Sequence, residues 1–484
     1  MMLFNQKRRS IPRVSHQPTD VRHSSLQGVR LAGSDRCLPI VYLATMLLLG
    51  PIALSFATDG LAAEQRILLV PAAPAPVSLT LDLPADRSLK PGDVVELVEV
   101  DASGTPLAEK PATLLADILP GIAADGTPSE PHRLAAIIPT RKGAASPRRF
   151  MPRMVEAKPS AAFALEEIDG RSLLVKDVAL SDAAGGEDNA DNARQADGPS
   201  ADQLVFQYNF GVITAEHVPE REHRRRRGCY IHPVWGMHGE VLTDDFPRDH
   251  YHHHGVFWTW PHVDFPEDDK KAYDSWQKDQ LWQEYHAWLA RRTGRVSAVV
   301  GVENHWMADR DQPRHVMTER MWMQPYQEAA GSRAIDLRLV LDPEKGPVTL
   351  WGAGGKSYGG MTMRFIGIPH KDQVVTTPDG PSKKDRKMTP LRWVDFARHF
   401  AGAPHRSGAT LMIHPAHPDY PPTWLTRTYG PQCVGWPGVE PQTLQPGSPV
   451  TLPYRIYIHD EEMSTEQLEA AYAAFVAGTK ARWE

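Results

Sequence analysis

The sequence predicts an all-β protein that closes with a single helix. Its 484 residues include 43 prolines and 36 glycines, and this density of turn-forming residues is typical of many short strands. Apolar and polar residues alternate in runs such as VSLTLDL and VVELVEV, which is the period of a half-buried strand. We therefore expect a large β-sandwich preceded by a small β-sandwich module.

Residues 1–63 are predicted to be a targeting segment. Seven Lys and Arg side chains precede residue 38, and the 20-residue run at 38–57 carries no charge. A basic leader before an apolar run is typical of an export signal that is later cleaved. An uncleaved run of this length would instead be a single transmembrane helix, and would be the chain's only contact with a membrane. Either interpretation places the rest of the chain in the periplasm or outside the cell.

Three segments follow the leader. Residues 64–180 show short alternating runs between turn signals, which indicates the small β module. Residues 181–203 are acidic and nearly free of apolar side chains, so they are predicted to be a disordered linker. Residues 204–484 hold the strands of the large β-sandwich and end in the expected helix. That helix begins after a Ser464 cap, where apolar residues take helical spacing.

Charge and cysteine content exclude some functions. The net charge is −6, so there is no electrostatic reason to expect nucleic acid as a partner. Three cysteines cannot build a disulfide scaffold. Cys37 lies in the leader, which leaves Cys229 and Cys433 as either one disulfide or two buried thiols.

Histidine and tryptophan concentrate in residues 217–315, which hold 12 of the 21 histidines and seven of the 13 tryptophans. The centre of this region is TDDFPRDHYHHHGVFWTW. If its histidines are extended, the period of two places His250, His252 and His254 on one face and His253 on the other.

Three imidazoles on one face suit either of two chemistries. They could bind one divalent metal ion through His250, His252 and His254, with Asp249 orienting a ring from behind. They could equally supply a general acid and a general base near neutral pH.

Other motifs add candidates outside this run. His232 lies in CYIHPVW, His414 lies in IHPAHP, and Glu303 and His305 lie near the end of a predicted strand. The loop GGKSYGG lacks the earlier glycine of a phosphate-binding loop, and a strand rather than a helix follows it. Lys356 in this loop is therefore expected to contact substrate, as is Tyr358. The four arginines at 224–227 are predicted to form a solvated turn.

Five of these motifs, taken in order, resemble the bacterial family labelled "methane oxygenase PmoA-like". The resemblance covers about residues 204–460 and rests on YIHPVW, TDDFPRDHYHHHGVFWTW, GGKSYGGMTMRF, RWVDFA and IHPAHP. It implies a sandwich of the galactose mutarotase type and the company of sugar-processing enzymes. Methane oxidation is not implied, because the methane monooxygenase subunit of that name has several membrane-spanning helices. The motif positions that match are His232, Asp245, Asp249, His250, His252, His253, Lys356, Tyr358, Gly359 and His414.

The sequence thus favours an exported carbohydrate-active protein that acts on a sugar or glycoside as a lyase, hydrolase or epimerase. Trp258 and Trp260 are expected to stack on pyranose rings while polar groups bind the hydroxyls. The expected catalytic residues are His250, His252, His232, His414 and Asp249. The expected substrate contacts are Trp258, Trp260, Lys356, Tyr358, Asp245 and His253.

Two other functions remain open. A metal-dependent oxygenase or hydrolase would hold a stoichiometric metal at the histidine run. A non-catalytic cell-surface carbohydrate-binding protein would keep its sugar affinity when the histidines are replaced.

Overall fold

The computed structural model describes residues 66–484 except 109–112, 142–145, 156–158, 179–203, 268–272, 278 and 368–371. The predicted leader at 1–63, its apolar run and the predicted linker at 181–203 lie outside the described residues. Within the described part of the chain, no helix combines the length and apolar character needed to cross a membrane.

The N-terminal residues form a seven-stranded antiparallel sheet, with the strand order β2-β5-β4-β3-β6-β1-β30. Alternation along β3 buries Val95 and Leu97 in the core of this sheet, where Ile118 and Leu134 join them. The last strand comes from the C-terminus, so both ends of the described chain meet in this module. The strands are β1 (Leu68–Val70), β2 (Val77–Asp82), β3 (Val94–Val100), β4 (Thr113–Ile122), β5 (Pro128–Ile138), β6 (Arg148–Met154) and β30 (Arg482–Trp483).

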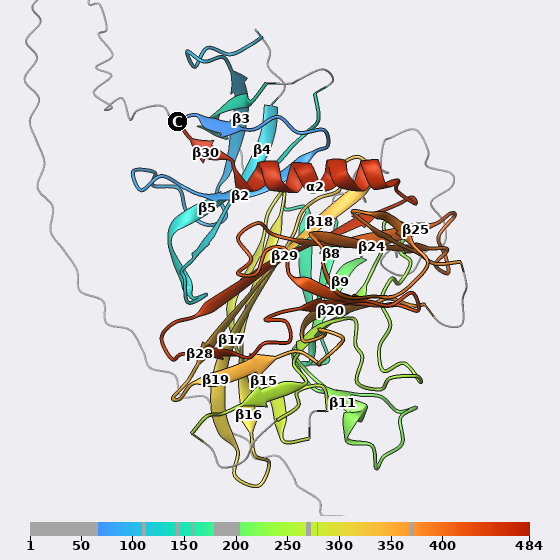
Figure 1. Ribbon diagram of the computed structural model, residues 1–484. Coiled ribbons are helices and arrows are strands. Elements are labelled where there is room, and N and C mark those ends of the chain that lie inside the picture. Colours follow the sequence, from blue (N-terminus) through green and yellow to red (C-terminus); the bar gives the residue numbers. More distant parts are fainter. Residues whose placement is uncertain are drawn as a thin grey trace, which may run out of the picture. The chain divides into compact units, whose positions relative to one another are not determined.

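The first large sheet has nine antiparallel strands in the order β15-β16-β17-β18-β29-β25-β24-β21-β22. Its long central strands appear in yellow to red in Figure 1. They are β15 (Leu281–Thr293), β16 (Ala298–Ala308), β17 (Arg314–Pro325), β18 (Ser332–Pro343), β21 (Val374–Thr377), β22 (Gly380–Ser382), β24 (Trp393–Arg398), β25 (Ser407–Ile413) and β29 (Val450–His459).

The second large sheet also has nine antiparallel strands, in the order β23-β26-β27-β20-β13-β12-β9-β8-β7. The hairpin β7–β8, which the sequence groups with the N-terminal module, pairs with β9 and so belongs to this sheet. The strands are β7 (Phe163–Ile168), β8 (Ser172–Asp177), β9 (Leu204–Asn209), β12 (Tyr230–Val234), β13 (Val256–Thr259), β20 (Gly360–Arg364), β23 (Arg386–Pro390), β26 (Thr423–Thr426) and β27 (Pro431–Gly435).

The described residues also form two smaller sheets and one short 3-10 helix. One sheet has three strands, β14 (His262–Asp264), β19 (Val348–Trp351) and β28 (Gln442–Leu444), and the other pairs β10 (Ile213–Thr214) with β11 (Arg226–Arg227). The 3-10 helix η2 spans His223–Arg225.

The two nine-stranded sheets share one hydrophobic core, which confirms the predicted all-β sandwich. From the second sheet, Trp258 and Met363 enter this core, and from the first sheet Val302 and Leu339 enter it. Because side chains alternate along a strand, the neighbours of the inward residues on β13 and β20 point to the opposite face. Arg364 is one of these outward residues and anchors the candidate site.

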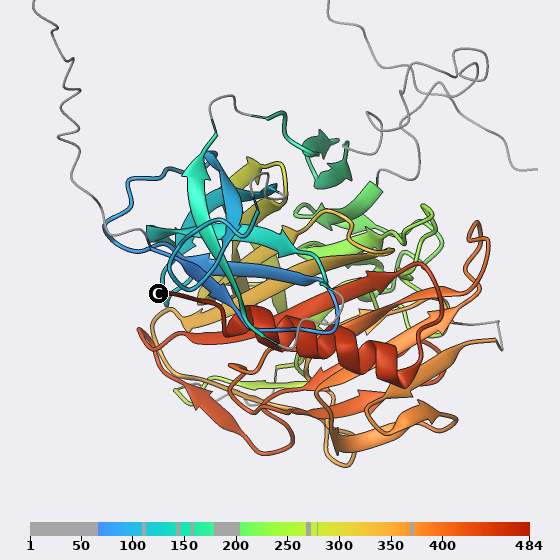
Figure 2. The ribbon, with the colours of Figure 1, turned by 90° about the horizontal axis from the view of Figure 1, so that it is seen from above.

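The described residues contain one α-helix, α2 (Thr465–Thr479), where the sequence predicts it. Ser464 and Gln467 form the capping box at its start. The helix buries Leu468 and Phe475 beside Trp393 of β24, and its small residues, including Ala474, join the core of the N-terminal sheet. Figure 2 shows α2, in red, alongside the blue strands of that sheet.

Cys229 and Cys433 are free thiols, and both are buried. Burial raises the pKa of Cys433 to about 11 and raises that of Cys229 as well. Of the two alternatives that the sequence leaves open, the structure shows two buried thiols.

Candidate functional site

The histidine run folds as two successive turns. The amide of His250 donates to the carbonyl of Pro247 at 2.9 Å, and the amide of His253 donates to the carbonyl of His250 at 2.9 Å. Strand β13 begins only at Val256. The expectation of an extended segment is therefore wrong, because Pro247 and the turns that follow it replace the alternation of a strand. The turns stack the rings of His250 and His253, whose centroids lie 4.6 Å apart at 8°.

A buried arginine holds the carboxylate beside His250. Arg364 is completely buried, and its Nη2 donates to Asp249 Oδ1 at 3.1 Å and to Oδ2 at 3.3 Å. Asp249 Oδ2 in turn lies 2.8 Å from Nδ1 of His250 and accepts a hydrogen bond from it. Burial alone would raise the pKa of Asp249, but the hydrogen bond from His250 and the charge of Arg364 together lower it. The carboxylate is therefore ionised at neutral pH.

This chain of contacts prepares His250 for proton transfer. When Nδ1 donates to Asp249, the lone pair of the neutral ring is on Nε2. The His250 side chain is 38% exposed, so a ligand can reach the imidazole. A carboxylate that fixes the tautomer and orientation of a histidine in this way is a known arrangement for a general base.

Aromatic side chains surround the three histidines of this site. Trp276 contacts the edges of His252 and His253, each with ring centroids 5.6 Å away, and packs at 5.1 Å against Tyr358. Tyr429 stacks on His250 at 5.9 Å and 15°. We call the following group the histidine site: Asp249, His250, His252, His253, Trp276, Tyr358, Arg364 and Tyr429.

His253 forms the buried floor of the histidine site. Burial lowers the pKa of its imidazole well below the usual value, and the neighbouring His252, Arg364 and His250 act in the same direction. The ring is thus neutral at pH 7. Its Nδ1 has no hydrogen-bond partner within the described ranges.

His254 and His232 are structural. His254 is completely buried, its Nδ1 donates to Asp245 Oδ1 at 2.7 Å, and Tyr230 donates to the other oxygen of that carboxylate at 2.8 Å. His232 bonds Thr243 Oγ1 at 3.0 Å, and burial lowers its pKa to about 3. The bond between Asp245 and His254 gives no support to a substrate contact at Asp245. The burial of His232 gives no support to proton transfer by that ring.

Trp258 and Trp260 do not present a face to any ligand. Both are completely buried in the core of the sandwich. Trp258 Nε1 donates to Glu319 Oε2 at 2.6 Å, and Trp260 Nε1 donates to the carbonyl of Trp436 at 2.6 Å. The expectation that they stack on sugar rings is wrong, because β13 and the turn after it are buried on both faces.

Two further predicted residues, His414 and Lys356, are not among the residues of the histidine site. His414 lines a cavity of about 480 Å³ whose other lining residues include Arg455 and Phe475, and none of these belongs to the histidine site. Burial lowers the pKa of His414. Lys356 is exposed on the loop two residues before Tyr358.

The arginine run at 224–227 is only partly a solvated turn. Arg226 is exposed, but Arg227 is buried, its Nη2 donates to Gln283 Oε1 at 2.9 Å and its guanidinium lies 5.3 Å from the centre of the Phe257 ring. Burial lowers the pKa of Arg227 to about 10. Alternation along β11 turns this one arginine inward, beside a cavity of about 780 Å³.

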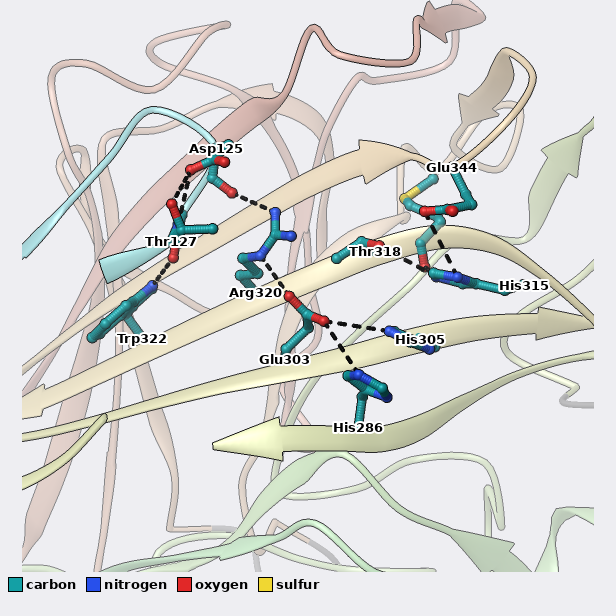
Figure 3. A network of polar contacts seen from close by, with 12 residues as sticks. Asp125, Thr127, His286, Glu303, His305, His315, Thr318, Arg320, Trp322 and Glu344 are labelled. Atoms are coloured by element: carbon teal, nitrogen blue, oxygen red, sulfur yellow. Dashed lines mark hydrogen bonds and ion pairs between the residues drawn. The ribbon is translucent and has the colours of Figure 1, made fainter. Parts of the chain in front are cut away.

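A second cluster of histidines lies on the first large sheet. Among the described residues, His286, Glu303 and His305 form the one group of three metal-ligating side chains whose ligand atoms all lie within 4.8 Å of one another. Figure 3 shows dashed lines that join Glu303 to both imidazoles. The predicted metal triad of His250, His252 and His254 does not form such a group. The sequence singles out Glu303 and His305 but not His286, which comes from a neighbouring strand.

Sequence reasoning missed Trp276, Arg364 and Tyr429 of the histidine site. Two of the three have a partial signal in the sequence: Arg364 ends the apolar strand MTMR, and Tyr429 precedes a glycine in a loop. An arginine at the end of such a strand suggests a buried ion pair, but the partner carboxylate, Asp249, lies 115 residues earlier.

Comparison with known families assigns the large domain. A family described as "Family of unknown function (DUF6807)" matches residues 197–473, which is over half of the chain and includes all five motifs quoted above. No match to a PmoA-like family is found, so the resemblance to that family is wrong. No curated protein matches the chain. The chain therefore belongs to the Family of unknown function (DUF6807).

Proposed function

We propose that the chain is an exported carbohydrate-active enzyme in which His250 moves a proton to or from a sugar or glycoside. The observation that carries this proposal is the line of contacts from buried Arg364 through Asp249 to a partly exposed His250. A positioned acid or base of this kind contributes about 10²–10⁴-fold to a reaction rate.

Asp249 and Arg364 have different roles in this chain of contacts. Asp249 fixes the imidazole with its lone pair on Nε2 and stabilises the imidazolium that forms after proton uptake. Arg364 keeps that carboxylate ionised and in place, and it acts through Asp249 rather than on the substrate. A positioned histidine suits lyase, hydrolase or epimerase chemistry, all of which involve a proton transfer to or from carbon or oxygen.

The aromatic side chains of the site support a sugar as the substrate. Tyr429 and Tyr358 are half-buried, so part of each side chain is accessible. Burial raises the pKa of both phenols, which keeps them protonated as hydrogen-bond donors at neutral pH. A flat ring with a polar tip matches the mixed apolar and hydroxyl faces of a pyranose. In this proposal the two tyrosines take the role that Trp258 and Trp260 cannot fill.

A panel of oxidised and unoxidised glycosides tests the proposal. The full chain is incubated with each glycoside, the products are identified by mass spectrometry, and binding is measured in parallel by calorimetry. We expect at least one glycoside to be converted, and a His223→Gln variant, altered at an exposed histidine outside the site, to convert it equally well. Tight binding without conversion of any glycoside would instead indicate the non-catalytic carbohydrate-binding protein.

A further inference from the structure

Three potential ligand atoms converge on the outer face of β15 and β16. Glu303 Oε1 lies 3.4 Å from Nε2 of His305 and 3.9 Å from Nε2 of His286. Figure 3 shows both imidazoles directed at this one oxygen. All three ligand atoms lie within 4.8 Å of one another. None of the three side chains belongs to the histidine site.

A β-bulge brings His286 into this group. The register pairs Tyr285 with Asn304 and Ala287 with Glu303, so His286 is the extra residue on β15. A bulge of this kind redirects a side chain, and bulges are frequent beside functional sites. On β16, residues 303 and 305 lie on one face because they are two apart in a strand. The sheet thus assembles the three side chains from an i, i+2 pair and one bulged residue.

The carboxylate of the group is already oriented. Arg320 Nε donates to Glu303 Oε2 at 2.8 Å, and its Nη1 donates to the carbonyl of Asp125 at 2.8 Å. The bond from Arg320 Nε occupies Oε2 of Glu303 and leaves Oε1 for the histidines. Outer contacts that fix a ligating carboxylate are a regular part of protein metal sites.

A third imidazole, that of His315, stacks on the group but offers it no ligand atom through Nε2. His315 stacks on His305 with ring centroids 3.8 Å apart at 15°. Its Nε2 lies 3.0 Å from the carbonyl of Met317 and donates to it, so this nitrogen is committed to the backbone.

We propose that His286, Glu303 and His305 bind one divalent first-row transition-metal ion, of the class of Zn²⁺, Ni²⁺ or Cu²⁺. Two imidazoles and one carboxylate are ligands that suit these ions better than Mg²⁺ or Ca²⁺, which prefer oxygen alone. Each ligand atom would lie about 2.0–2.2 Å from the ion, which requires ligand atoms about 3.3 Å apart. Glu303 and His305 already meet this spacing.

The rings of His286 and His305 stack with centroids 4.0 Å apart at 18°, so the His286 side chain must turn for its Nε2 lone pair to face the ion, and this side chain is 54% exposed. Each neutral imidazole would bind the ion through the lone pair of Nε2 and carry its single proton on Nδ1, so neither neutral ring loses a proton. Three protein ligands leave one coordination position open for water or a ligand oxygen.

Calorimetric titration of the chelator-treated full chain with ZnCl₂ tests the site. We expect one equivalent to bind with a Kd in the micromolar range or below, and affinity to fall at least tenfold in His305→Ala and in His286→Ala. His315→Gln is the matched control, because it removes a stacked ring but no ligand, and it should bind Zn²⁺ as the unaltered chain does. Zn²⁺ should also raise the thermal unfolding temperature of the unaltered chain and not that of His286→Ala, whose exposed side chain can be removed without disturbing the core.

Two results would overturn the site. One is a chain that binds no Zn²⁺ below millimolar concentration, and the other is tight binding that survives both His305→Ala and His286→Ala. The outcome is independent of the proposed acid–base function, since no residue is shared between the two sites.

Discussion

Arg364 and Asp249 form an ion pair in which the guanidinium is completely buried and the carboxylate is 29% exposed. Arg364 Nη2 reaches both carboxylate oxygens, at 3.1 and 3.3 Å. The pair ties strand β20 to the turn that carries the three histidines, so the conformation of the site depends on one strand residue.

Removing the guanidinium should cost both stability and site geometry. In Arg364→Met the partly buried carboxylate loses its charge partner, and we expect the free energy of unfolding to fall by about 3 kcal/mol. Denaturant unfolding measures this loss. The matched control is Arg386→Met, whose pair with Asp379 lies at the surface and should contribute about 0–1 kcal/mol. Equal effects of the two substitutions would show that burial of Arg364 does not matter.

Acid should destabilise the fold through its buried neutral histidines. The pKa of His232 is about 3 in the folded state because the ring is buried, whereas an exposed imidazole titrates near 6.5. As the pH falls below 6.5 the unfolded chain takes up the proton first, so stability is present above this pH and is lost below it. At pH 5 the loss from one such histidine is about 2 kcal/mol.

Unfolding curves at pH 7 and pH 5 test this linkage. The difference in unfolding free energy between the two pH values should shrink in His232→Gln by about the amount assigned to that ring. It should stay unchanged in His223→Gln, which alters an exposed histidine. A pH dependence that is identical in the two variants would contradict the role of His232.

Tyr429, and not Trp258, should carry the stacking on a sugar. Trp258→Phe removes the indole donor to buried Glu319, so we expect about 1–3 kcal/mol of lost stability and unchanged glycoside affinity. Tyr429→Ala should weaken glycoside binding by about tenfold, since it removes an accessible ring. Tyr429→Phe keeps the ring and should bind nearly as well as the unaltered chain. Weakened binding in Trp258→Phe alone would contradict the assignment.

The fold could be predicted from the sequence because its signals are local. Alternating strands, turn residues and the cap at Ser464 each depend on residues a few positions apart, and the sandwich and α2 follow from them. It is harder to predict from the sequence which side chains are buried. The tryptophans at 258 and 260 look like binding residues in sequence, yet both faces of β13 are covered, and only the pairing of the two sheets decides this.

The candidate site could be predicted in part. The sequence identifies the histidine run, Asp249 and Tyr358, because unusual residue types cluster there. It does not reveal the turns that stack His250 on His253, nor that Arg364 of β20 and Tyr429 of the loop between β26 and β27 close the site. The bulge at His286 is likewise invisible in sequence, since it depends on the register of β15 against β16.

The most direct test of the account is the turnover number of His250→Gln on the glycoside that the unaltered chain converts. Glutamine keeps a polar side chain at this position but cannot accept a proton near neutral pH. The account predicts a kcat lowered by about 10²-fold or more with KM little changed. A kcat equal to that of the unaltered chain would contradict His250 as the acid or base.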